Sequence, residues 1–159
     1  RGFSFMKEGP LDMRMDTSTK LTALLWLKEA DLEDISRVLK IYGEEKYSYR
    51  IAKAIKKAII ENNLKTTIEL SKIISNCYPK NKSSKINPAT RSFQAIRIYI
   101  NKELQELEKI LDDCLQIIGI GGRIVVISFH SLEDRIVKKF INKHSLGKAE
   151  ISKLPITNL

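Results

Sequence analysis

The sequence has few of the residues that build disulfides, metal sites and nucleotide-binding turns. Its two cysteines, Cys77 and Cys114, lie far apart and form no C-x-x-C, so we expect ordinary reduced thiols and no metal site. Its seven glycines contain no G-x-G-x-x-G run, so no cofactor-binding residue is assigned. No apolar run approaches the ~18–20 residues that a membrane-spanning helix needs. We therefore expect a cytoplasmic protein without a membrane partner.

Positive charge is abundant and concentrated in one segment. The 159 residues carry a net charge of +9, and between Lys46 and Ile86 ten Lys or Arg residues face only two Glu. Such a concentration is the expected footprint of a polyanionic partner such as RNA. Lysine outnumbers arginine 20 to 8, so the nucleotide composition of the genome is a second explanation.

Residues 17–86 read as a basic helical domain that follows a loop over 1–16. Helices are expected from Thr17 or Ser18, and from Asp31 to a C′ residue at Gly43. A third helix is expected over about 44–61. Thr66 and Glu69 form a capping box that opens a fourth helix through residue 74, before a polar loop over 76–87.

The third predicted helix carries a basic stripe at helical spacing. Its members recur at i, i+4, i+7 and i+11, and they are Lys46, Arg50, Lys53 and Lys57. Like charges at i,i+4 repel by a few tenths of a kcal/mol, roughly, and RNA phosphates would offset this repulsion. A solvated lysine face explains the same pattern equally well.

A long amphipathic helix is expected after Asn87-Pro88, as far as Cys114. Hydrogen-bonding side chains occupy one face of it within about 120° of arc, and they are Arg91, Gln94, Arg97 and Asn101. An ordinary exposed face is one reading. The other is one wall of a substrate pocket, because these side chains suit bases and phosphates.

A strand is predicted over residues 123–128, after the turn Gly121-Gly122, and polar residues follow it at once. A β-branched run of this kind is typical of a strand buried inside a parallel sheet, and ligands bind at the carboxyl ends of such strands. The polar residues are His130, Ser131, Glu133, Asp134 and Arg135. A capping pattern with its hydroxyl at Ser131 accounts for three of them without any chemistry, but not for His130 and Arg135.

The loop over 1–16 ends in alternating charges. Asp12, Arg14 and Asp16 lie on one side if the segment is extended. A salt-bridged loop is one interpretation, and positioning of substrate is the other.

Four blocks of sequence resemble the bacterial small-subunit ribosomal RNA methyltransferase H family, also called MraW. They are RGFSF at 1–5 with GPLDMRMD at 9–16, YGEE at 42–45 with RIA at 50–52, PATR, FQA and RI within 88–98, and FHSLEDRIVKKF at 129–140. The resemblance implies methyl transfer from S-adenosylmethionine to the exocyclic N4 of a cytidine in 16S ribosomal RNA. It also implies small-subunit RNA or the assembling subunit as partner.

The family's cofactor site lies upstream of the RGFSF block, so we expect an internal fragment, inactive alone, that lacks the N-terminal cofactor-binding part and the C-terminal strands. A separate N-terminal polypeptide is a possible partner. The expected fold is an α-dominated fragment of an α/β Rossmann-like methyltransferase. It divides into a loop over 1–16, a helical insertion over 17–86, a helix–strand–helix unit over 87–146 and a tail over 147–159.

The expected site combines three groups of residues. His130, Glu133 and Asp134 are the catalytic candidates, because the amine must lose a proton and His has a suitable pKa, roughly 6.5. The substrate-binding candidates are Ser131, Arg135, Arg91, Gln94, Arg97, Asn101, Asp12 and Arg14. The residues of the basic stripe are expected to contact RNA phosphates. A non-enzymatic RNA-binding or ribosome-associated module, or an inactive remnant, is the alternative function.

Overall fold

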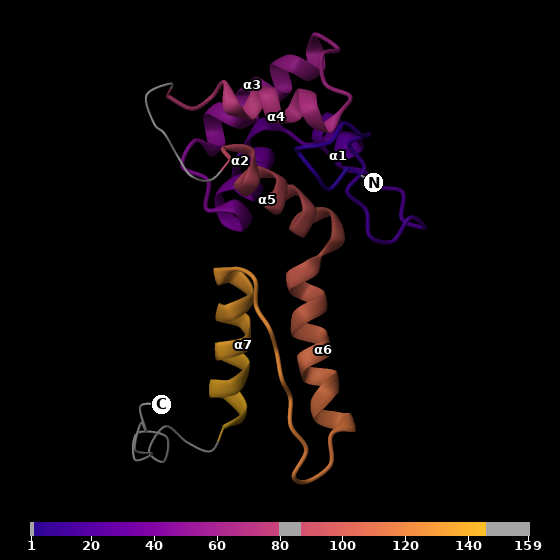
Figure 1. The fold of residues 1–159 in the computed structure, drawn as a ribbon, viewed down its shortest axis with the longest axis vertical. Coiled ribbons are helices and arrows are strands. Elements are labelled where there is room, and N and C mark those ends of the chain that lie inside the picture. The colour runs from indigo at the N-terminus through magenta and orange to yellow at the C-terminus, as the bar shows by residue number, and fades with distance from the viewer. Residues whose placement is uncertain (1, 80–86, 146–159) are drawn as a thin grey trace. The chain divides into compact units, whose positions relative to one another are not determined.

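The computed structural model describes residues 2–79 and 87–145, and nearly all of their regular secondary structure is helical (Figure 1). The helices in chain order are α1 (Ala23–Glu29), α2 (Leu32–Gly43), α3 (Ser48–Ile60), α4 (Thr67–Ser75), α5 (Ala89–Asn101), α6 (Glu103–Ile117) and α7 (Ser131–His144). The only β-type pairing in the described part is an isolated bridge between Pro10 and Thr66. The expectation of an α-dominated chain is therefore confirmed.

The chain divides into two compact units, Arg1–Glu103 (unit 1) and Leu104–Leu159 (unit 2). The predicted tail over 147–159 and most of the predicted loop over 76–87 lie outside the described residues. None of the helices in the described part is long and apolar enough to cross a membrane.

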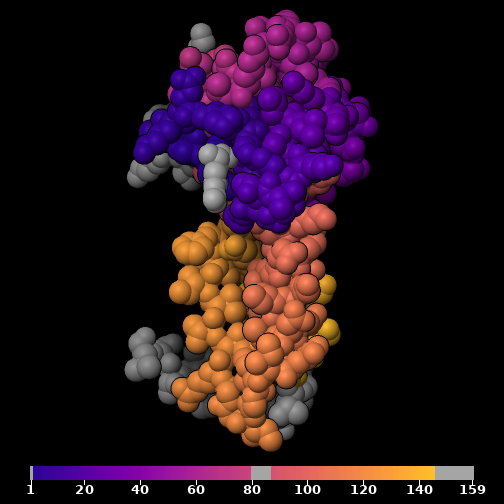
Figure 2. Space-filling view, turned by 90° about the vertical axis from the view of Figure 1, so that its right-hand side faces the viewer, coloured from indigo at the N-terminus to yellow at the C-terminus, as the bar shows by residue number. Residues whose placement is uncertain are grey.

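Unit 1 is built around α2, which packs most extensively on α5 and α3. Its core is aliphatic, and the fully buried members include Leu27, Ile35, Leu39, Ile51, Ile55, Leu70, Ile74 and Ile96. The N-terminal loop contributes Leu11 and Met13 to this core. Figure 2 shows the N-terminal residues, in indigo, spread over the surface of this unit.

Local sequence signals account for several helix starts. Asp31 caps α2 by accepting the Asp34 N–H at 2.8 Å. The predicted capping box at the start of α4 is present: Thr66 Oγ1 accepts the Glu69 N–H, and Glu69 Oε2 accepts the N–H groups of Lys65 and Thr66. These backbone donors hold the pKa of Glu69 below its usual range. At the start of α5 the N-cap is Pro88, and Asn87, which the sequence suggested as the N-cap, accepts the Ala89 N–H at 2.8 Å.

Other helix boundaries differ from the prediction. The first helix begins at Ala23 with Thr22 as its N-cap, because residues 17–19 are held in a turn by Arg14 and Asp16. The residue in the left-handed conformation after α2 is Glu44, with φ of 48°. Gly43 is the last helical residue, and a Cβ there would meet the Arg91 carbonyl oxygen at 2.6 Å. Glycine is thus required for the close approach of α2 to α5.

The single long helix expected after residue 87 is in fact two. Lys102 adopts a left-handed conformation with φ of 52° and ends α5, and α6 begins at the next residue. The Asn101 side chain bonds back to the Arg97 carbonyl at 2.8 Å and across to the Met13 carbonyl at 2.7 Å. Tertiary hydrogen bonds at the end of α5 therefore override a sequence that contains no helix breaker here.

The prediction of a paired strand over residues 123–128 is wrong. The segment runs without regular secondary structure, and no partner strand exists among the described residues. Val125 is 86% exposed and Ile127 is 77% exposed, whereas Ile124 and Val126 are about half as exposed or less. The segment thus keeps the two-residue alternation of a strand, but a strand needs a partner to satisfy its backbone groups. The Rossmann-like character of the fold stays a prediction.

In unit 2, residues of α6 and α7 line a small, mainly apolar cavity. It measures 190 Å³ and is lined by Glu108, Leu111, Asp112, Ile136, Lys139, Phe140 and Lys143. Asp112 lies 4.0 Å from Lys143 Nζ and 3.9 Å from His144 Nε2 at its edge. Leu111 is the one hydrophobic residue of unit 2 that is buried among those described.

Candidate functional site

The HSLED motif forms the first turn of α7, with His130 as the N-cap in place of the expected Ser131. His130 Nδ1 accepts the Glu133 N–H at 3.3 Å, and Glu133 Oε2 accepts the Phe129 N–H at 2.8 Å. This pair resembles a capping box in which an imidazole replaces the usual hydroxyl, except that Glu133 accepts from Phe129, the residue before the N-cap, and not from the N-cap itself. The capping reading of the motif therefore holds for Glu133, although with a different cap residue.

The His130 imidazole keeps one polar atom without a hydrogen bond. Its Nε2 is buried and has no hydrogen-bond partner among the described residues. Glu133 Oε1 lies 3.5 Å from it. Because Nδ1 accepts a backbone hydrogen bond, the proton of the neutral ring lies on Nε2. A donor and a carboxylate oxygen therefore stand next to each other at the start of α7.

The remaining candidates of this motif make local contacts along α7. Asp134 pairs with Lys138 Nζ at 2.8 Å. The Arg135 Nε donates to the Ser131 carbonyl at 3.3 Å. The first turn of α7 thus gathers all five predicted residues, and their chemical roles stay predictions.

Asp12 and Arg14 form a bidentate ion pair in the N-terminal loop. Arg14 donates to the two carboxylate oxygens at 2.5 and 2.9 Å, and also to the Thr17 and Thr19 carbonyls. These bonds hold the pKa of Asp12 below its usual range. The salt-bridged loop that the sequence suggested is therefore present.

Asn101 fastens this loop to α5. Its Oδ1 accepts the Met15 N–H at 2.6 Å, and its Nδ2 donates to the Met13 carbonyl. Met13 between these contacts is fully buried and has a positive φ of 59°. A non-glycine residue keeps such a conformation only where its surroundings fix it, and Asn101 and the Asp12–Arg14 pair do so here.

The other polar residues of the α5 face contact the ends of neighbouring helices. Gln94 Nε2 donates to the Tyr42 carbonyl at 3.3 Å, and Arg91 reaches the Glu44 carbonyl at 3.5 Å. Arg97 forms a bidentate pair with Glu103 at 2.8 and 3.0 Å. The structure places these residues in unit 1 and His130 in unit 2.

The α3 basic stripe is defined by Lys46, in the turn just before α3, and by Arg50, Lys53 and Lys57 within α3, which begins at Ser48 and not near residue 44 as predicted. All four side chains are exposed, and Lys57 is 3.7 Å from Glu61. No ion pair joins the other three to an acidic residue in the described part of the chain. Lys56 is excluded from the stripe, because its Nζ donates to the Lys28 and Ala30 carbonyls at 3.1 and 2.8 Å.

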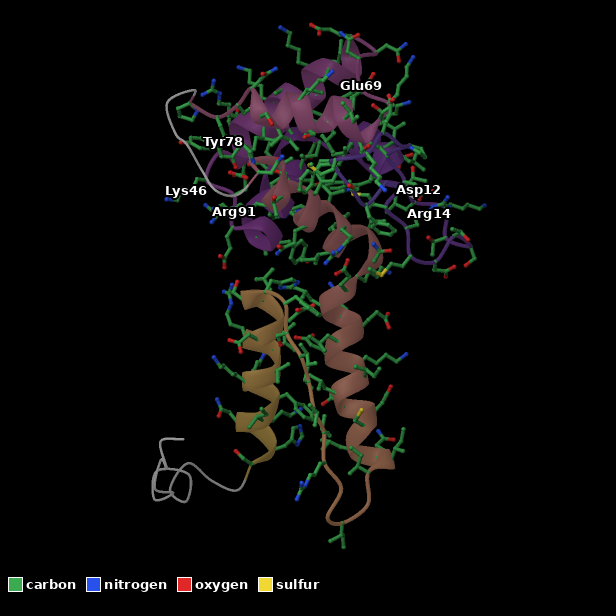
Figure 3. The ribbon with its side chains drawn as sticks, in the orientation of Figure 1. Asp12, Arg14, Lys46, Glu69, Tyr78 and Arg91 are labelled. Atoms are coloured by element: carbon green, nitrogen blue, oxygen red, sulfur yellow. The ribbon has the colours of Figure 1, made fainter. Side chains whose placement is uncertain are left out.

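Sequence reasoning missed a buried carboxylate between α2 and α3. Glu45 is only 2% exposed and accepts the Tyr78 hydroxyl at 2.5 Å and the Tyr47 N–H at 3.1 Å. The rings of Tyr47 and Tyr78 meet edge to face at 4.9 Å. Burial, followed by the hydrogen bond to Glu45, raises the pKa of Tyr78. Figure 3 shows Lys46, Tyr78 and Arg91 at the same end of unit 1.

Neither described cavity fits a large cofactor. Beside the cavity between α6 and α7, a second one of 260 Å³ is formed by Gly2, Phe3, Ser4, Lys7, Glu8 and Gly9. Drug-sized ligands usually occupy about 300–1,000 Å³. No group of three or more His, Cys, Asp or Glu side chains among the described residues is arranged to hold a metal ion.

Comparison with known proteins gives matches over nearly the whole chain. The model of the MraW methylase family matches residues 1–158. A protein of Hamiltonella defensa subsp. Acyrthosiphon pisum (strain 5AT), named ribosomal RNA small subunit methyltransferase H, is 52% identical over all 159 residues, which cover 51% of its length. The protein of the same name from Coxiella burnetii (strain Dugway 5J108-111) is 55% identical over 145 residues, 91% of this chain and 47% of that protein. The chain thus spans about half the length of the curated relatives it matches.

Proposed function

The chain belongs to the MraW methylase family, and from this premise we propose that it is part of an enzyme that methylates small-subunit ribosomal RNA. The reaction transfers a methyl group from S-adenosylmethionine to the exocyclic N4 of a cytidine. The observation that carries the proposal is the match over residues 1–158, together with two relatives above 50% identity named for this RNA substrate. The enzyme acts in the cytoplasm on the RNA or the assembling subunit.

The first turn of α7 offers groups that complement cytosine. His130 Nε2–H is a donor and Glu133 Oε1 is an acceptor, 3.5 Å apart. Cytosine presents the opposite pair on one edge, with N3 as acceptor and N4–H as donor, and carboxylates accept hydrogen bonds from N4. An unsatisfied buried donor costs about 1–3 kcal/mol, which a cytosine acceptor at Nε2 would recover.

This arrangement divides the roles of the three catalytic candidates. His130 orients the base through Nε2, because the bond from the Glu133 N–H occupies Nδ1. The Glu133 carboxylate takes the proton that the amine loses when it is methylated. Asp134 is held by Lys138 on the next turn and adds negative charge to the same helix start.

S-adenosylmethionine supplies the methyl group as a sulfonium. The two described cavities are smaller than ordinary ligand pockets, and we therefore place no step of the methyl transfer on the residues that line them. A separate N-terminal polypeptide, or a longer protein that contains this chain, supplies the cofactor-binding part under this proposal.

The test is methyl transfer by the protein that contains this chain. Small-subunit RNA is incubated with labelled S-adenosylmethionine, digested to nucleosides and separated by chromatography. The proposal expects label in N4-methylcytidine. Label confined to another nucleoside, or none with a folded complete protein, would refute it.

A second candidate function is RNA binding without chemistry. The exposed α3 basic stripe favours it, because phosphate binding requires no cofactor. A filter-binding measurement beside the labelling assay distinguishes the two functions, because a binding module retains RNA on the filter but incorporates no label.

A further inference from the structure

Tyr49 is the most exposed tyrosine of the described residues, at 60%. The other four all pack their rings on aromatic neighbours: Tyr42 and Tyr99 on each other, Tyr99 on Trp26, and Tyr47 on Tyr78. Tyr49 makes no aromatic contact within the described chain. A large aromatic ring left in water contributes little to folding, so its position calls for another explanation.

The Tyr49 ring lies on the edge of the α3 basic stripe. Tyr49 is four residues before Lys53 within α3, a spacing that places side chains next to each other on a helix, and Lys46 lies in the turn that precedes α3. At about 100° per residue, Tyr49 and Lys53 stand about 40° apart around α3. The surface therefore combines a free π-face with a row of cations.

Unpaired RNA matches this combination better than duplex RNA does. A-form helices enclose their base faces and expose phosphates and 2′-hydroxyls, so a tyrosine finds no face to stack on. Single strands offer unstacked bases, and proteins bind them with a basic groove and aromatic side chains. The row of cations favours a polyanionic partner, and the exposed ring favours single-stranded RNA, because only unpaired bases offer a face for stacking.

We infer that the exposed side of α3 is a docking surface for single-stranded RNA, on which Tyr49 stacks against a base and the α3 basic stripe contacts the phosphates. This inference rests on the proposed function, since it names the form of RNA that unit 1 holds. The stacking is independent of base identity, because every base has a π-face.

The experiment measures binding of the full 159-residue chain to two probes by fluorescence anisotropy. One is a single-stranded oligouridylate of about 12 nucleotides, within the usual range of single-strand site sizes. The other is an RNA duplex with the same number of phosphates per strand. The variants are Tyr49→Ala, Tyr49→Phe and Tyr49→Leu, each checked for helicity by circular dichroism.

Tyr49→Ala should weaken binding to the oligouridylate about tenfold, in the range measured when base-stacking rings are removed. Its affinity for the duplex should not change. Tyr49→Phe should retain the wild-type affinity, because it keeps the ring. Tyr49→Leu should resemble Tyr49→Ala, because it keeps the bulk without a π-face. Equal affinity of Tyr49→Ala and wild type for the single strand, or an equal loss on both probes, overturns the inference.

A quadruple variant separates this inference from the proposed function. Replacing the α3 basic stripe with Gln should flatten the slope of log affinity against log salt, by up to about three units at ~0.7 per contact. The matched control removes the same charge elsewhere in unit 1, with Lys20, Lys28, Lys40 and Lys72 replaced by Gln. If the quadruple variant and its control behave alike, the phosphate contacts of the inference fail, whereas the proposed methyl transfer is judged separately by the labelling assay. If only Tyr49→Ala is without effect, the inference alone fails.

Discussion

Glu45 shows how a single residue is held by groups that are distant in the sequence. Its carboxylate is buried in unit 1 and accepts hydrogen bonds from Tyr78, 33 residues away, and from the Tyr47 backbone. In the sequence Glu45 is the second of two glutamates after Gly43, a position that alone suggests an exposed turn residue. Nothing in the local pattern points to Tyr78, so this contact required the tertiary structure.

Removing the Tyr78 hydroxyl should destabilise the chain. Tyr78→Phe leaves the buried Glu45 carboxylate without its side-chain donor, and hydrogen bonds to charged groups are worth about 1.5–3 kcal/mol. The free energy of unfolding in urea, followed by circular dichroism, measures the loss. Tyr49→Phe is the matched control, because it removes an exposed hydroxyl and should change stability by less than about 0.5 kcal/mol.

Because of Tyr78, the chain should also lose stability at alkaline pH. The pKa of Tyr78 is raised in the folded chain, chiefly by burial, above the unfolded value of about 10. The protonated hydroxyl is therefore the form that folding favours. This stabilisation is complete below pH about 10 and is lost as the pH rises towards the folded pKa. Urea midpoints of wild type should fall above pH 10 more steeply than those of Tyr78→Phe, and parallel curves would contradict the assignment.

His130 combines two roles that mutation can separate. His130→Ala removes both the N-cap acceptor of α7 and the imidazole, whereas His130→Asn keeps a capping acceptor. If the imidazole orients the cytosine, both variants of the protein that contains this chain should lose methyl transfer, about 100-fold or more. Only His130→Ala should also lose stability, by about 1 kcal/mol. Wild-type turnover in His130→Asn would reduce His130 to a helix cap.

At the scale of elements, the sequence predicts best what is decided locally. The caps at Asp31 and Thr66 and the capping box with Glu69 form as expected, since their partners lie within four residues. The break at Lys102 was missed because neither glycine nor proline marks it. The strand over 123–128 was also wrong, because pairing depends on a second strand and apolar sequence alone does not supply one.

The break between α5 and α6 gives a prediction about strain. Lys102 is exposed and has a positive φ of 52°, a conformation that costs a side-chain-bearing residue roughly 1–2 kcal/mol. Lys102→Gly should therefore stabilise the chain by about 0.5–1 kcal/mol, since glycine adopts this conformation freely but loses more entropy on folding. Lys102→Ala is the control and should be nearly neutral. A destabilising Lys102→Gly in urea titrations would show that α5 and α6 gain more from continuity than from the break.

At the scale of the whole molecule, the two units differ in how many buried apolar residues they contain. Unit 1 contains nearly all of the buried apolar residues of the described chain, whereas unit 2 contains Leu111. The predicted helical insertion over 17–86 forms part of unit 1 together with α5, because α2 packs on α5 more than on any other helix. Sequence blocks identified the family, but the placement of α5 depends on the close contact at Gly43, which a glycine in a sequence does not reveal.

This 159-residue chain alone should not bind S-adenosylmethionine. The sequence has no glycine-rich turn, and the two described cavities, of 190 and 260 Å³, lie below the about 300–1,000 Å³ of ordinary ligand pockets. Titration calorimetry should therefore show no saturable heat at micromolar ligand. Thermal unfolding provides an independent readout, because a ligand at 100 times its Kd would stabilise the folded state by about 2.7 kcal/mol. The complete protein that contains this chain is the positive control and should show both effects. Saturable binding by the 159 residues alone would mean that they form a cofactor site that neither the glycine pattern nor the described cavities indicate.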